Sequence, residues 1–173
     1  EGCSSLVSLT LLGNMTQIEK DTFKDCVKLE TIVLPKNIEI VGIGAFKNCR
    51  SLKPLDLGNK IKEIKYDSHE GAFNNCSSLE TINLGESQVK VHPKHLIGCD
   101  NLKEIKYDAS NVETQFENGM VFNKNGTALV KCVRSQNQGT CIVPSNVLAI
   151  KKEAFADTDF SEIVINDNVK EIG

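Results

Sequence analysis

The stretch CVKLETIVLPKNIEIVGIGAFKN, residues 26–48, decides the fold because its pattern recurs along the chain. Its leading cysteine returns at spacings of 23, 23, 27 and 23 residues. These cysteines are Cys3, Cys26, Cys49, Cys76 and Cys99. Each opens the phrase Cys-x-x-Leu-x-x-Leu/Ile-x-Leu/Tyr, and in the first three units a second apolar set and a phenylalanine follow. A fixed period of this length indicates a repeat architecture.

The phrase after each cysteine alternates apolar and polar residues, as a short strand with one buried face does. One such strand is not stable alone, but copies stacked in parallel bury a continuous ladder of Leu and Ile. The return stretch has room only for a helical or 3-10 turn. We therefore expect a solenoid of short parallel strands in one sheet, with short turns opposite. A buried column on the turn side is expected from Phe23, Phe46, Phe73, Leu96 and Phe155.

Three departures interrupt the period. The third unit carries four extra residues around 66–69, and the fourth replaces Ala-Phe by His95-Leu96. After Tyr107 an Asn125-Gly126 turn between apolar runs predicts an inserted β-hairpin. We expect a single domain over residues 1–173, with repeats over 1–108 and 140–173 and the hairpin at about 109–139. The phase is open at both ends, which predicts a piece of a longer array.

The unit resembles the BspA-like, or Treponema-type, leucine-rich repeat, which reads C-x-x-L-x-x-I-x-L-P followed by I-G-x-x-A-F-x-x-C. The stretch GMVFNKNGTALVKC, residues 119–132, also resembles the hairpin that interrupts such arrays. The resemblance implies a right-handed leucine-rich repeat solenoid in a large cell-surface or secreted protein. It further implies adhesion to host matrix proteins, epithelium or other bacteria. Because every matching residue is structural, the resemblance specifies the fold more closely than the function.

Composition and motifs argue against several functions. A net charge of -3 gives no basic excess for nucleic acid, and no apolar run is long enough to cross a bilayer. Catalytic and cofactor-binding motifs are missing from the sequence, so we expect no enzyme activity and no cofactor. We expect a monomer. The sequons Asn14-Met-Thr, Asn75-Cys-Ser and Asn125-Gly-Thr matter only in a eukaryotic source.

Two groups of side chains are candidates for metal or disulfide sites. The spacing of His92, His95 and Cys99 is compatible with metal ligation. However, Pro93 is expected to break the helix that would place both histidines on one face, so we predict no metal site. The ladder thiols are expected to pack as small hydrophobes, because parallel Cβ vectors on neighbouring strands lie too far apart for a good bridge. For Cys132 and Cys141 the sequence is compatible with either a disulfide or two thiols.

The residues between the ladder positions point outward and are free to vary, so they are the candidate binding surface. We predict a protein or glycan ligand on host or neighbouring cells, held weakly and by repetition, since few aromatic anchors are present. Two alternatives remain open: a merely solvated strand face, and a spacer that displays another domain. The candidate binding residues are Thr10, Thr31, Val33, Asp56, Thr81, Asn83, Glu104 and Lys106.

Overall fold

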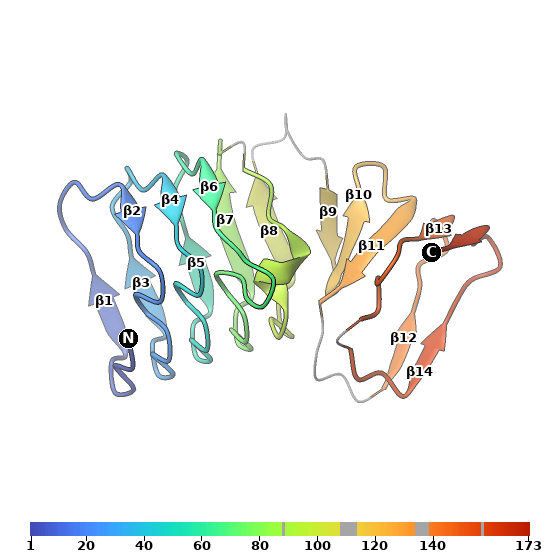
Figure 1. Cartoon of the computed structure of the whole chain (residues 1–173), viewed down its shortest axis with the longest axis horizontal. Coiled ribbons are helices and arrows are strands. Elements are labelled where there is room, and N and C mark those ends of the chain that lie inside the picture. The colour runs from blue at the N-terminus through green and yellow to red at the C-terminus, as the bar shows by residue number, and fades with distance from the viewer. Residues whose placement is uncertain (88, 108–113, 134–138, 157) are drawn as a thin grey trace.

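The computed structural model describes residues 1–87, 89–107, 114–133, 139–156 and 158–173. Within them the chain forms a β-solenoid of about seven turns, stacked along the long axis of the molecule (Figure 1). The expected fold class is thereby confirmed. The second half of each repeat phrase forms a strand, and these strands, with their equivalents after the hairpin, make up a first set. They are β1 (Ser8–Thr10), β3 (Thr31–Val33), β5 (Pro54–Asp56), β7 (Thr81–Gly85), β8 (Glu104–Tyr107), β12 (Thr140–Ile142) and β14 (Glu162–Val164).

The first set pairs in parallel and in phase, as the period predicts. Leu9 lies opposite Ile32, and Ile82 lies between Leu55 and Ile105. The hydrogen-bonded ladder is not one sheet, since it is interrupted between β3 and β5 and again between β8 and β12, on either side of the hairpin. Pro54 at the start of β5 explains the first interruption, because it has no N–H to donate to the preceding strand.

A second ladder, which the sequence did not predict, runs along the return stretches. Its strands are only two residues long, and β2, β4 and β6 pair in parallel, as do β13 and β15. In the first three of these strands one branched side chain points inward into the core. Hydrogen-bonded turns complete the return, and η1 (Pro93–Leu96) is the one helical element among the described residues. The strands are β2 (Gln17–Ile18), β4 (Ile40–Val41), β6 (Glu63–Ile64), β13 (Ala149–Ile150) and β15 (Glu171–Ile172).

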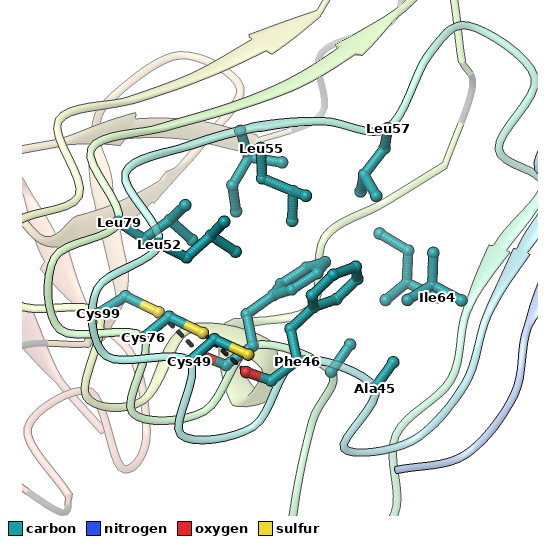
Figure 2. Packing of buried hydrophobic residues seen from close by; sticks show 14 of the residues in the cluster. Ala45, Phe46, Cys49, Leu52, Leu55, Leu57, Ile64, Cys76, Leu79 and Cys99 are labelled. Carbon is teal, nitrogen blue, oxygen red and sulfur yellow. Dashed lines mark hydrogen bonds between the residues drawn. The ribbon is translucent and has the colours of Figure 1, made fainter. Parts of the chain in front are cut away.

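The core between the two ladders consists of columns of one side-chain type (Figure 2). Phe23, Phe46 and Phe73 form the expected aromatic column, with ring centroids 5.2 and 6.0 Å apart. Leu96 continues the column and is fully buried, while Phe155 packs against the separate core of the last turns. Each such buried side chain contributes on the order of 1.5–3 kcal/mol.

The ladder cysteines are thiols and do more than fill space. The Sγ atoms of Cys49, Cys76 and Cys99 lie in one row in Figure 2. Each donates to the carbonyl of the phenylalanine one turn back, at 3.1, 3.0 and 3.2 Å. Burial raises the pKa of Cys49 and Cys99 to about 12, so both stay protonated donors at neutral pH. Cys3 is exposed.

The expected hairpin is present and is built into the array. The strands β10 (Met120–Asn123) and β11 (Ala128–Cys132) pair antiparallel, and β9 (Thr114–Glu117) adds a third antiparallel strand. The strand β11 also pairs in parallel with β13, so it takes the place of a second-ladder strand for the last turns. The buried Cys132 and Cys141 are both thiols in this structure. Of the expected hairpin bounds, about 109 and 139, the first lies outside the described residues, and residues 134–138 just before the second are also outside them.

The residue before each ladder cysteine forms a further column. Asp25, Asn48 and Asn75 all have φ of 61°, and Gly98 has φ of 78°. The Asn75 amide donates to Asn48 Oδ1 at 3.0 Å, and the Asn48 amide donates to Asp25 Oδ1 at 2.6 Å. Asn, Asp and Gly tolerate this left-handed conformation, which explains the residue types at the position.

Comparing two substitutions at Asn48 separates the backbone conformation from the side-chain ladder. Both Asn48→Gly and Asn48→Ala remove the two side-chain hydrogen bonds. Glycine adopts the left-handed conformation without a Cβ, whereas alanine keeps the Cβ but loses the polar side chain that makes this conformation tolerable, so Asn48→Ala should cost roughly 1–2 kcal/mol more than Asn48→Gly. Urea unfolding of the whole chain measures the difference. Equal destabilisation by the two variants would show that the backbone conformation does not constrain this position.

Candidate functional site

The predicted binding residues lie on one exposed face of the first-set strands, which we call the strand face. Thr10 lies opposite Val33, while Asp56, Asn83 and Lys106 form one continuous row. A second row places Thr81 opposite Glu104, and Thr31 lies near Val33 on β3. Thr81 and Asn83 are half-buried, and the other six are exposed. The structure therefore arranges all eight in ordered columns.

Polar contacts link several side chains of the strand face to their neighbours. The Asn83 amide donates to Asp56 Oδ1 at 3.2 Å, and Lys106 Nζ lies 3.6 Å from Glu104 Oε2. Beside them Lys103 Nζ lies 2.8 Å from Glu80 Oε2, which lowers the pKa of Glu80 through a hydrogen bond and charge attraction. The face is therefore electrically mixed, with apolar Val33 57% exposed within it.

The four-residue insertion and the irregular fourth unit, which are separate in the sequence, contact each other on the turn side of the solenoid. Tyr66 of the insertion stacks on His92, with ring centroids 4.3 Å apart and planes 14° apart. His95 packs edge-on against both rings, at 5.2 Å from Tyr66 and 6.5 Å from His92. The contact follows from the period, because residues about one unit apart in sequence occupy neighbouring turns.

Pro93 has a different role from the one expected. The sequence predicts that it breaks a helix between the histidines, but it begins η1, where a missing N–H is tolerated. His92 Nδ1 accepts from Lys94 N at 3.2 Å and so caps this turn. Among the residues that the structure describes, no three His, Cys, Asp or Glu side chains converge as a possible metal-ligand set.

His95 is fully buried and neutral. Its Nδ1 accepts from Ala72 N at 3.1 Å, while its Nε2 has no hydrogen-bond partner among the described residues. Burial, and then the neighbouring His92, lower the pKa of His95 to about 3. The Ile64 carbonyl acts weakly in the other direction but makes no hydrogen bond of normal geometry with Nε2. Burial also lowers the pKa of His92, with Lys94 adding to the effect.

The aromatic group forms part of one wall of a half-open cleft of about 940 Å³. The insertion and the segment around η1 supply this wall, and β11 and the turn at Lys152 and Glu153 supply the other. At one end of the insertion Lys47 Nζ pairs with Glu70 Oε2 at 2.5 Å. None of the strand-face residues lines the cleft. The chain thus offers two separate candidate surfaces.

These features define the class of protein. The 23-residue unit, its parallel ladders and its inward Leu columns are those of a leucine-rich repeat solenoid. The chain matches the family described as "BspA type Leucine rich repeat region (6 copies)" over residues 1–127 and 130–173, and it belongs to that family. Proteins of this family are often on the cell surface, and leucine-rich repeat domains typically bind partners rather than catalyse reactions.

Solved structures with the same fold come from bacteria. A leucine-rich repeat protein from Eubacterium ventriosum is 18% identical, with a TM-score of 0.58 over 96% of this chain and 49% of its own. One from Bacteroides ovatus is also 18% identical, with a TM-score of 0.51 over 99% of this chain and 64% of its own. The chain thus spans about half of the first protein. A search of curated proteins finds no match.

No helix among the described residues has the length and apolar character to cross a bilayer.

The buried histidine predicts a pH dependence of stability. His95 has a pKa of about 3 when folded and an ordinary one near 6.5 when unfolded, so the unfolded state binds more protons between these values. Titration of His95 therefore does not change the free energy of unfolding above about pH 6.5. Below that pH the free energy of unfolding falls by up to roughly 1.4 kcal/mol per pH unit until about pH 3, because protonation of His95 favours the unfolded state.

The variant His95→Asn keeps an acceptor near the position of Nδ1 and cannot titrate. The difference between the wild-type and variant unfolding free energies, measured by urea titration from about pH 7 to about pH 4, should therefore shrink or reverse as the pH falls. A difference that stays constant over this range would contradict a neutral buried His95.

Proposed function

We propose that this chain is an extracellular, non-catalytic binding module of a cell-surface or secreted protein. Its ligand is a protein or glycan of a host or neighbouring cell, and the strand face contacts it. The observation that carries the proposal is the alignment of eight variable side chains in fixed columns. The repeat determines their positions but not their identity.

The composition of the strand face supports weak contacts that are repeated. Its side chains are mostly threonines and charged groups, without the Trp, Tyr or Arg that dominate strong hot spots. Several of the charged groups already have partners within the face, so each separate contact exchanges one polar partner for another. Avidity from several copies compensates for such weak single contacts.

A quadruple variant tests the proposal. The whole chain, coupled in many copies to beads, is applied to a printed array of extracellular-matrix proteins and glycans. Asp56→Ala, Asn83→Ala, Glu104→Ala and Lys106→Ala together should reduce the wild-type array signals about tenfold or more, since a combined loss of about 1.4 kcal/mol in binding free energy per copy of the chain is a factor of ten.

A charge-matched control lies away from the strand face. Glu39→Ala, Asn59→Ala, Lys62→Ala and Glu63→Ala remove the same residue classes from the second-ladder side and should leave the signals unchanged. Circular dichroism checks that both variants fold. Equal signals from the wild type and the strand-face variant would mean that the chain binds through another surface, and would overturn the proposal. No signal from the wild type would also overturn it and would favour a spacer that displays another domain.

A further inference from the structure

The cleft on the turn side has a charge opposite to that of the chain. The chain carries a net charge of -3, but five lysines line the cleft against two glutamates. Glu70 is paired with Lys47, and Glu153 lies 4.0 Å from Lys152. The lysines are Lys47, Lys90, Lys94, Lys131 and Lys152. Positive charge concentrated in a concave site attracts anions more strongly than the same charge on an open surface.

The walls of the cleft hold a fixed aromatic surface. Tyr66 is 45% exposed although its ring stacks on His92. The capping bond from Lys94 N fixes the His92 ring, and buried His95 supports both rings from the side. A tyrosine ring that is held in place and left half-exposed presents an apolar face on which a ligand ring can stack.

Polar groups for hydroxyl recognition lie beside this aromatic surface. Ser68, Asn74 and Asn75 line the cleft. Buried Asn74 is held in place because its Oδ1 accepts from Gly71 N at 2.5 Å. Asp67 accepts the N–H groups of His69 and Glu70 at 2.8 and 2.9 Å, which stabilises the turn of the insertion and lowers the pKa of Asp67. The volume of about 940 Å³ lies within the range of small-molecule sites.

We infer that this cleft binds an anionic saccharide. The sugar ring stacks against the Tyr66–His92 pair, the amides and Ser68 meet its hydroxyl groups, and its carboxylate or sulfate lies among the lysines, where charge-assisted hydrogen bonds are strongest. A saccharide uses all three features together, whereas an acidic peptide would need only the charges. The site is independent of the strand face, so its success or failure is separate from that of the proposed function.

Titration of the isotope-labelled whole chain, followed by NMR, tests the inference. The probes are 3′-sialyllactose as the carboxylated sugar, a heparin disaccharide as the sulfated sugar, lactose as the neutral sugar and hexaglutamate as the acidic peptide. At least one anionic sugar should saturate shifts of residues around Tyr66 and Lys94, with weaker binding at high salt. The two anionic arms distinguish a carboxylate from a sulfate ligand.

Matched variants separate the stacking from the charge. Tyr66→Ala should raise the Kd roughly threefold to tenfold, and Tyr66→Phe should leave it nearly unchanged, because stacking needs the ring. Lys152→Gln should weaken binding, whereas Lys151→Gln should not, since Lys151 does not line the cleft and lies 3.7 Å from Glu171.

Four results would overturn the inference. They are no saturable shift with either anionic sugar, equal binding of lactose, tighter binding of hexaglutamate, and equal effects of the two lysine variants.

Discussion

The whole structure depends on the stacking of equivalent residues in consecutive turns. One turn buries too little apolar surface to be stable, so each ladder position must meet its copy in the next turn. This requirement explains the columns of a single residue type, from the phenylalanines with centroids 5.2 and 6.0 Å apart to the thiols that donate to the preceding turn. It also explains why the hairpin does not end the array: β11 provides the strand on which β13 stacks.

The sequence predicted the features that depend on the period and missed those that depend on very short segments. The first ladder was visible because three Leu or Ile positions recur in each unit. The second ladder was not, since a two-residue strand such as Ile40–Val41 has no alternation to detect. The Asn125-Gly126 turn revealed the hairpin, but β9 has no comparable signal. The left-handed column was present in the sequence as Asp25, Asn48, Asn75 and Gly98, and only the backbone angles showed its cause.

Both candidate surfaces are formed by positions whose residue type the stacking of the repeats does not determine. Strand-face residues were predictable, because alternation makes every second side chain point outward. The insertion around 66–69 and the unit with His92 and His95 are visible in the sequence as departures from the period. The cleft that they form is not, because its geometry depends on how one turn lies against the next. Tyr66 and His92 occupy neighbouring turns, and the cleft closes only where β11 and the turn at Lys152 approach from later units. The irregular units thus form the cleft, which a stack of identical turns would not contain.

Amide hydrogen exchange of the whole chain tests most directly whether the turns are stable only as a stack. The N–H groups of Phe46 and Asn48 donate to the carbonyls of Ala72 and Asn74 in the next turn, at 2.8 and 2.9 Å. If stacking is the source of stability, these amides exchange slowly and with opening free energies close to one another, because opening one turn removes its neighbour's support. Fast exchange of these amides while the amides of β10 and β11 stay protected would contradict the account.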